Sequence, residues 1–328
     1  MRICLILEGC YPYIFGGVST WMHQYINEMK EHEFVLWVIG ANAKDKGKFV
    51  YELPKNVVEV HEVFLDDALR LKDSGKMLHA FTEEETNSLK ELMLCRRPNW
   101  EILFRLYHDQ KLNPMSFLRS EEFLNILTEC CIKDYPYTPF ADAFHTMRSM
   151  LLPVLYLMGS EVPKADVYHA ICTGYGGLLA CLGGHVYKKK VLLTEHGIYT
   201  REREEEIIRA KWVQPAFKKQ WISFFYMLSD IIYTRAFLVS ALFTNAMHAQ
   251  IQMGCDKEKC RVVENGINYE RLSPIPLKEE DGWVDIGAIV RLAPIKDIKT
   301  MIYAFYELCT TRNHVRLHIR SEEHTSEL

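Results

Sequence analysis

The chain has 328 residues, of which 48% are hydrophobic and 12% aromatic, enough apolar material for the cores of about two globular domains. Its formal net charge of -4 argues against a nucleic-acid-binding protein, which normally carries a basic excess. The ten cysteines form no Cys-x-x-Cys pair, and several lie inside apolar runs. We therefore expect free thiols in a reduced, cytoplasmic protein rather than a disulfide scaffold.

No targeting or membrane-spanning segment is expected. The apolar run at 3–7 ends at Glu8, too early for the hydrophobic region of a signal peptide. The longest apolar stretches, around 150–158 and 236–243, fall well short of the roughly 20 residues that a transmembrane helix needs.

The N-terminal residues predict a βαβ unit. A short apolar strand at 3–7 is followed by Gly16 and Gly17, a helix from Ser19 to about 30, and a second strand at 34–39. Short continuous apolar strands around a helix are typical of a parallel sheet buried on both faces. The sequence therefore predicts an α/β fold that begins with a Rossmann-like sheet.

Residues 65–160 break this alternation and predict a helical insertion. Helical patterns cover 65–94, 100–106, 121–132 and 141–157, with many aromatic residues. These aromatic residues are expected to form a local core, and a surface for an acceptor or partner is the alternative.

The α/β pattern resumes at 166. Strands are expected at 167–170, 191–194, 238–243 and 261–263. Helices are expected at 176–184 and 247–253, and between them a charged helix that begins at 201 is followed by an aromatic helix that ends at 233. Gly266, Pro274 and Pro276 mark a linker. Beyond it a strand at 284–290, a helix at 298–310 and a strand at 315–319 begin a second Rossmann-like domain.

Two segments of the first domain are candidates for a site. Gly16 and Gly17 follow the first strand, where a backbone without side chains can approach a phosphate at a helix N-terminus. Neither they nor the glycines at 174–177 form a Gly-x-Gly-x-x-Gly fingerprint, which disfavours a nicotinamide dehydrogenase. His196 follows another strand, flanked by Glu195 and Arg201. A histidine satisfied by the backbone and a solvated helix face are the structural alternatives.

The loop after the strand at 284–290 carries two cations, Arg291 and Lys296. Preorganised cations stabilise the charge that develops on a diphosphate leaving group as a glycosidic bond breaks. The chain contains no Asp-x-Asp, so a metal-chelating sugar-nucleotide site is not expected. Asn265 and Gly266 form a reversal that leads the chain across the cleft between the two expected domains.

Taken in order, four segments resemble one family. They are Gly16-Gly17-Val18, Glu195-His196-Gly197, Glu264-Asn-Gly-Ile-Asn268 and Val290-Arg-Leu-Ala-Pro-Ile-Lys296. This set is similar to the retaining glycosyltransferases of family four, which have the GT-B fold. Within that family, residues 7–21, 193–203 and 294–300 resemble the PelF group of Pel exopolysaccharide synthesis, which builds biofilm polysaccharide. The resemblance covers residues 1 to about 319.

The resemblance implies a function and roles. The donor would be a UDP-sugar such as UDP-glucose or an N-acetylhexosamine nucleotide, with no other cofactor and no metal. Arg291 and Lys296 would hold its diphosphate, Gly16 and Gly17 would lie against phosphate and acceptor, and His196 would contact the transferred sugar. The remaining candidates in the cleft are Glu8, Glu195, Arg201 and Asn265. The acceptor would be a growing polysaccharide, passed to an inner-membrane Pel synthesis and export complex that recruits the cytoplasmic enzyme.

The domain organisation expected from the resemblance is an acceptor-side domain at 1–270, with its insertion at about 65–160, and a donor-binding domain that opens at 271–319. The family's two glutamates spaced by seven residues have no counterpart, so we expect a C-terminally truncated chain without transfer activity. Residues 320–328 are expected to be an adapter-derived extension, with a natural tail as the alternative. Glu264 and Asn268 replace the family's usual Pro and Asp at the hinge. The competing hypothesis is a non-catalytic fragment that binds acceptor or partner.

Overall fold

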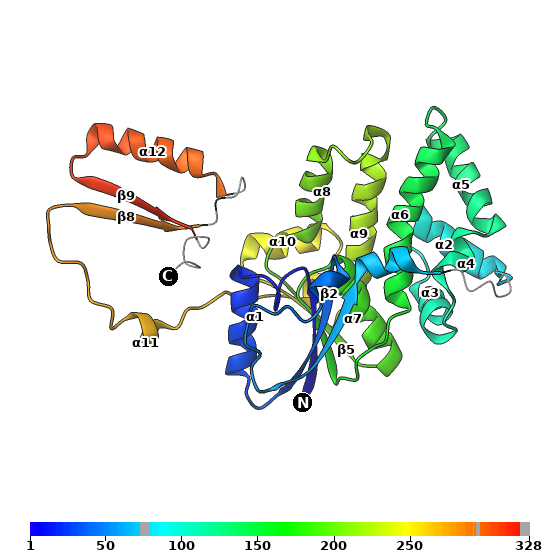
Figure 1. Ribbon diagram of the computed structural model, residues 1–328, viewed down its shortest axis with the longest axis horizontal. Helices are drawn as coiled ribbons and strands as arrows, with labels where there is room; N and C mark the ends of the chain where they lie inside the picture. The colour runs from blue at the N-terminus through cyan, green and yellow to red at the C-terminus, as the bar shows by residue number, and fades with distance from the viewer. Residues whose placement is uncertain (73–78, 291, 293–295, 322–328) are drawn as a thin grey trace. The chain divides into compact units, whose positions relative to one another are not determined.

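The computed structural model describes residues 1–72, 79–290, 292 and 296–321. The chain divides into two compact units, Met1–Asn265 and Gly266–Leu328, which are described one at a time. Figure 1 shows the elements of each unit.

The first unit is built on a seven-stranded sheet in which all neighbouring strands are parallel. The strand order is β3-β2-β1-β4-β5-β6-β7. This confirms the predicted α/β class. The strands are β1 (Arg2–Glu8), β2 (Glu33–Gly40), β3 (Val57–Phe64), β4 (Val167–Ala170), β5 (Lys190–Glu195), β6 (Leu238–Ala241) and β7 (Cys260–Val262).

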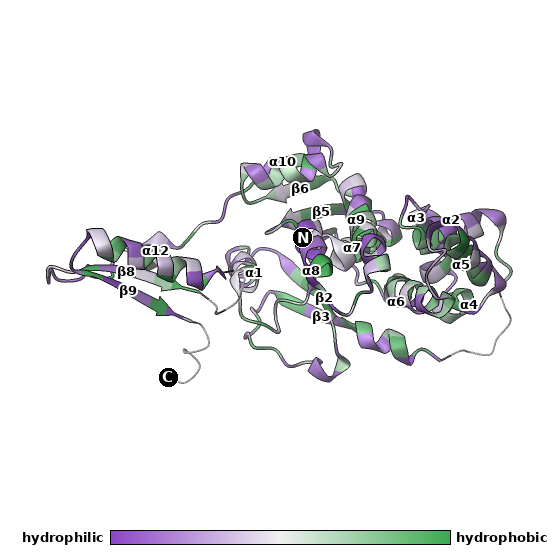
Figure 2. Ribbon diagram, turned by 90° about the horizontal axis from the view of Figure 1, so that it is seen from above, coloured by the Kyte–Doolittle hydropathy of each residue, from purple (hydrophilic) through white to green (hydrophobic). Residues whose placement is uncertain are grey.

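Helices cover both faces of the sheet. On one face, Met22 and Ile26 of α1 (Gly17–Glu28) pack against Leu5 and Leu36. The other face is covered by α7 (Gly174–Tyr187) and α9 (Lys218–Arg235), and its core includes Trp37. Figure 2 shows α1 on one side of the strands and α7 and α9 on the other. Burial on both faces explains why the central strands read as continuous apolar runs.

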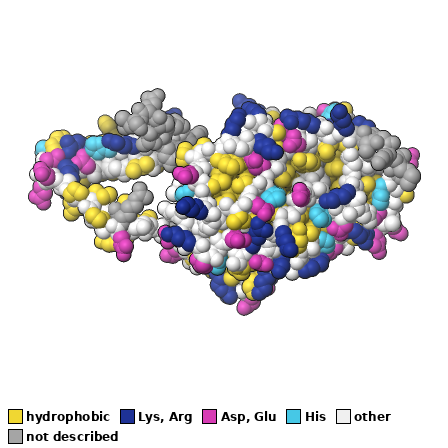
Figure 3. All heavy atoms as spheres, turned by 60° about the horizontal axis from the view of Figure 1, so that its bottom comes forward, with side chains coloured by type: hydrophobic (Ala, Val, Ile, Leu, Met, Phe, Trp, Pro, Cys, Tyr) yellow, Lys and Arg dark blue, Asp and Glu magenta, His cyan; other side chains and the backbone are white. Residues whose placement is uncertain are grey.

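Two further helices complete the sheet's surroundings, α8 (Tyr199–Arg209) after β5 and α10 (Thr244–Gln252) after β6. Short 3-10 turns lie at Ala43–Asp45, Leu65–Arg70 (η2), Pro215–Phe217 and Lys257–Lys259. On the face of the first unit seen in Figure 3, basic and acidic side chains are interspersed, as expected from a net charge of -4.

The insertion between β3 and β4 forms an additional helical layer. Its long helix α6 (Phe140–Met158) packs against α7 and carries nine buried side chains. The other helices are α2 (Glu83–Met93), α3 (Trp100–Phe104), α4 (Pro114–Leu118) and α5 (Glu121–Asp134), with a π-helical turn, η3, at Arg105–Asp109. Phe104, Tyr107 and Phe117 are fully buried here and form core as predicted, whereas Tyr137 is 99% exposed and does not.

The second unit contains a parallel pair, β8 (Val284–Ile289) and β9 (Val315–Arg320), joined through α12 (Ile298–Thr311). The short helix α11 (Tyr269–Leu272) precedes it. This is the predicted second βαβ unit. The predicted tail at 320–328 lies outside the described residues from 322 on.

Two elements differ from the sequence predictions. Strand β3 was not predicted, because its alternation of Val with Glu and His lacks the continuous apolar run of the central strands. In the described part of 65–94, where one helix was expected, the structure has a 3-10 turn at Leu65–Arg70 and helix α2, which begins at the capping box of Thr82 and Glu85. The Thr82 side chain accepts the Glu85 N–H and fixes the start of α2 there.

Candidate functional site

The candidate site lies where the strand order of the first unit reverses. Chain connections run outward from β1 and β4 in opposite directions, which opens a crevice at the carboxyl ends of the central strands. A cavity of about 190 Å³ is found there, lined by Glu8, Cys10, Val18, Ile171, Cys172, His196, Gly197, Tyr199, Glu202 and Arg203. Its polar residues come from β1, from the β5–α8 loop and from α8.

Glu8, the last residue of β1, is anchored by three donors. Its Oε1 accepts the Tyr199 hydroxyl at 3.0 Å, and its Oε2 accepts the Gly176 N–H at 3.2 Å and the Cys172 thiol at 3.8 Å. Burial raises the pKa of Glu8, and the nearby Arg203 opposes that rise. The carboxyl is thus held rigidly in the wall of the cavity.

Tyr199 holds its position because Gly174 lets it approach. Gly174 has a φ of +63°, and a Cβ at this position would contact the Tyr199 ring. Only glycine adopts this backbone conformation without strain. The start of α7 and the start of α8 are thereby packed together around Glu8.

His196 presents an unpaired ring nitrogen. Its ring forms a T-shaped contact with Trp21, with centroids 4.5 Å apart and an interplanar angle of 71°. Its Nε2 is buried and has no hydrogen-bond partner among the described residues. Burial lowers the pKa of His196, so the ring is neutral near pH 7 and can exchange a hydrogen bond with a hydroxyl group.

Glu195, although adjacent in sequence, does not line this cavity. It is 2% exposed, and its Oε2 accepts the Tyr233 hydroxyl at 2.7 Å and the Gln250 amide at 2.9 Å. Burial raises the pKa of Glu195 to about 7. Alternation along the strand end thus directs Glu195 into the fold and His196 into the cavity.

The other predicted residues lie in different places. Gly16 caps α1 and Gly17 begins it, and a Cβ at either would meet no atom within 4 Å, so the space above them is open. Arg201 is exposed on α8 and does not line the cavity. Asn265 is exposed at the end of the first unit. Lys296 is exposed just before α12 in the second unit, and Arg291 lies outside the described residues.

Sequence reasoning missed Arg203. Its guanidinium lies 5.1 Å from the centre of the Tyr199 ring and pairs with Glu206 at 2.6 Å. Arg203 follows Tyr199 by four residues on α8, so the two side chains share one helix face. A prediction that α8 begins at Tyr199 rather than 201 would have identified it.

A carboxyl, a neutral imidazole and a guanidinium therefore converge on a space that would hold roughly six water molecules of about 30 Å³. These groups supply hydrogen-bond donors and acceptors to a compact polyhydroxylated ligand. In the described part of the chain, no three His, Cys, Asp or Glu side chains gather closely enough to bind a metal ion. Nor does any helix of that part have both the length and the apolar composition to span a bilayer.

Several solved structures resemble the chain over 97% of its length. HepE from Anabaena, in complex with UDP-glucose, matches with 11% identity and a TM-score of 0.45, and the lipopolysaccharide outer core galactosyltransferase WaaB with 12% and 0.43. The UDP-GlcNAc 2-epimerase of Methanocaldococcus jannaschii matches with 10% and 0.37. The chain spans 60% of the first two proteins and 65% of the third. At these scores the likeness is too distant to assign a function.

Among curated proteins, none matches the chain. One family model does match, over residues 1–258, and its description is "Domain of unknown function (DUF3492)". The matched segment contains strands β1 to β6, the helical insertion and every residue of the cavity, whereas the edge strand β7 follows it. The chain belongs to the DUF3492 family.

Proposed function

We propose that this protein is a UDP-sugar-dependent glycosyltransferase of the GT-B type, whose first unit forms the acceptor side of the active site. The observation that carries the proposal is the convergence of Glu8, His196 and Arg203 at the switch point of the parallel sheet. A neutral imidazole with an unsatisfied Nε2, next to an anchored carboxyl, suits the hydroxyl groups of a sugar better than it suits a phosphate.

The reaction that we propose moves a hexose or an N-acetylhexosamine to a growing exopolysaccharide, with retention and without a metal ion. The bond between the sugar's anomeric carbon and the diphosphate oxygen breaks, a bond to an acceptor hydroxyl oxygen forms on the same face of the ring, and the hydroxyl proton leaves with the diphosphate. Lys296 and Arg291 of the second unit would hold the departing diphosphate and stabilise its charge. Gly16 and Gly17 leave room for the donor above the N-terminus of α1.

The motif resemblance to the PelF group supports a finer proposal. In it the protein works in the cytoplasm with an inner-membrane Pel synthesis and export complex, and UDP-glucose or an N-acetylhexosamine nucleotide is the donor.

Binding and transfer test the proposal separately. Calorimetry with UDP, UDP-glucose and UDP-N-acetylglucosamine should show binding, and His196→Ala should weaken the binding of the UDP-sugars about tenfold, the value of one lost hydrogen bond, while leaving UDP itself unchanged. The matched control is His248→Ala, because His248 is exposed on α10. Sugar transfer to an oligosaccharide acceptor, followed by mass spectrometry, then tests the expectation that residues 1–328, which lack the family's two glutamates, do not catalyse transfer on their own.

The outcomes separate the candidate functions. No binding of any uridine nucleotide up to about 10 mM would refute a UDP-sugar enzyme. Oligosaccharide binding without nucleotide binding would favour the alternative, a non-catalytic protein that binds acceptor. Equal losses for His196→Ala and His248→Ala would remove the role of His196 in sugar recognition.

A further inference from the structure

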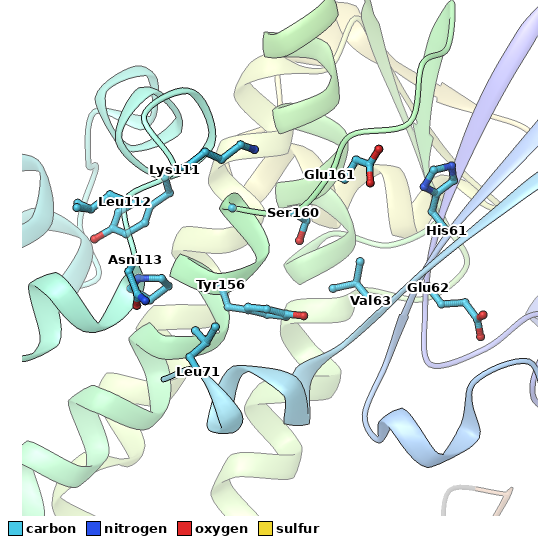
Figure 4. A pocket seen from close by; sticks show the side chains of 13 residues that line it. His61, Glu62, Val63, Leu71, Lys111, Leu112, Asn113, Tyr156, Ser160 and Glu161 are labelled. Atoms are coloured by element: carbon cyan, nitrogen blue, oxygen red, sulfur yellow. The ribbon is translucent and has the colours of Figure 1, made fainter. Parts of the chain in front are cut away.

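A second and larger hollow lies between the edge strand β3 and the helical insertion. Its volume is about 480 Å³, and it shares no lining residue with the Glu8 cavity. Three segments form most of it: His61 and Val63 of β3, the turn at 111–113 between η3 and α4, and residues 156–161 at the end of α6. Figure 4 shows Tyr156 in the middle, Lys111 and Asn113 on one side, and His61 and Glu161 on the other.

The hollow exists because β3 is only partly covered. His61 and Val63 pair in register with Trp37 and Ile39 of β2, so they share the sheet face that α6 and α7 cover. Trp37 and Ile39 are buried, whereas His61 and Val63 are only half-buried. Glu62 points to the opposite face, where it accepts the Tyr13 hydroxyl and the Gly47 N–H. An accessible strip of the core face is therefore left beside α6.

Several polar side chains around this hollow lack partners among the described residues, although His61 pairs with Glu59 and Asn113 donates to the Lys72 carbonyl. Among the described residues, no hydrogen bond or ion pair involves the side chain of Lys111, Tyr156, Ser160 or Glu161. The hydroxyl of Tyr107, a fully buried lining residue, also has no hydrogen-bond partner. An unpaired buried hydroxyl costs about 1–3 kcal/mol unless a ligand or water satisfies it.

The lining combines an apolar floor with a polar rim of both charges. Val63, Leu71 and Leu112 are half-buried hydrophobic residues of the lining, and the ring of Tyr156 lies among them. Burial raises the pKa of Tyr156, with Asp67 and Asp66 contributing, so its hydroxyl remains a donor at neutral pH. Lys111 and Glu161 together supply one charge of each sign, which does not favour an anionic ligand such as a nucleotide.

We propose that this hollow binds an oligosaccharide segment of the acceptor chain at a distance from the reacting sugar. A pyranose ring has an apolar face that packs on tyrosine and equatorial hydroxyl groups that reach donors and acceptors around it. The volume is about two and a half times that of the Glu8 cavity, enough for more than one ring. That the bound saccharide is the acceptor of a glycosyltransferase rests on the proposed function. That the hollow binds a saccharide does not.

Direct binding of short saccharides to the whole chain tests this proposal. Cellotriose, maltotriose and N,N′,N″-triacetylchitotriose are titrated by calorimetry and by saturation-transfer NMR. We expect at least one to bind with a Kd of about 1–10 mM, and Tyr156→Ala and Glu161→Gln to weaken that binding about fivefold or more. Glu161 is exposed, and its side chain has no partner among the described residues, so its substitution keeps the test valid if Tyr156→Ala fails to fold.

Matched controls come from the same insertion. Tyr137→Ala replaces a tyrosine that is 99% exposed, and Glu121→Gln replaces an exposed glutamate at the start of α5. Neither should change saccharide binding. A loss in the controls equal to that in Tyr156→Ala would overturn the assignment of the hollow.

UDP binding, measured in parallel, separates this proposal from the proposed function. No trisaccharide binding beside intact UDP binding would overturn the saccharide site alone. Trisaccharide binding that His196→Ala abolishes and Tyr156→Ala leaves intact would also overturn it, because the ligand would then occupy the Glu8 cavity. Tyr156-dependent binding without UDP binding would support the site while refuting the transferase.

Discussion

The buried carboxyl of Glu195 allows a test of the electrostatics at the sheet edge. Burial raises its pKa from 4.5 to about 7, although Tyr233 and Gln250 donate hydrogen bonds to it. Between these two pH values the native state holds a proton that the unfolded chain has released. Because the native state binds more protons in this window, the free energy of unfolding falls as the pH rises through it. The difference between the two pKa values corresponds to about 3 kcal/mol.

Glu195→Gln removes the titrating group and keeps an oxygen that can accept from Tyr233 and Gln250. Urea unfolding, followed by tryptophan fluorescence, should be measured at pH 5 and pH 8 for both proteins. We expect the stability of the variant relative to the wild type to increase by about 2–3 kcal/mol between these pH values.

Subtracting the wild-type free energy of unfolding from that of the variant at each pH cancels the contributions of all other titrating groups. Glu28→Gln, an exposed position on α1, is the control and should follow the wild type at both pH values. The reasoning is refuted if the difference between Glu195→Gln and the wild type is the same at pH 5 and pH 8, since Glu195 would then be ionised in the native state throughout.

Two further substitutions test the packing around the site. Gly174→Ala should lower stability by about 1–3 kcal/mol, because an alanine there has a strained φ and its Cβ contacts the Tyr199 ring. Gly47→Ala, where φ is +69° and no atom lies within 4 Å of the Cβ, should cost only about 1 kcal/mol. Equal melting temperatures for the two variants would contradict this. Arg235→Ala should cost about 1 kcal/mol in urea unfolding, because Arg235 pairs with Glu101 of α3 at 2.7 Å and lies over Phe104. Arg97→Ala, 85% exposed with Asp230 at 3.4 Å, should change stability by less than about 0.5 kcal/mol, and an equal loss in both variants would show that the Arg235 contacts add nothing.

The sequence predicted the central strands well because a strand that is buried on both faces reads as a continuous apolar run. Strand β1 was expected at 3–7 and spans Arg2–Glu8, and β4 was expected at 167–170 and spans Val167–Ala170. The edge strand β3 carries the weaker alternating pattern of a half-covered strand, with Glu59 and Glu62 between its valines. Its omission also hid the hollow beside α6, because that hollow depends on the incomplete cover of β3.

For the site residues, the sequence predicted the position in the sheet but not the direction of each side chain. Strand ends could be located from the sequence, so Glu8 and His196 could be placed at the carboxyl edge of the sheet. The direction of each side chain there depends on the strand register and on the first residue of the next helix. Because β5 ends at Glu195, that carboxyl turns into the fold toward Tyr233 and Gln250, and His196 faces the cavity.

The same dependence decides between Arg201 and Arg203. Helix α8 begins at Tyr199, so position 203 lies one turn further along the same face, and the guanidinium lies over the tyrosine ring that donates to Glu8. Position 201 is rotated by about 200° from Tyr199, which accounts for its exposure. A shift of two residues in the start of one helix thus exchanges which arginine reaches the cavity. Arg203→Ala should therefore disturb the Glu8 cavity, and Arg201→Ala should leave it intact.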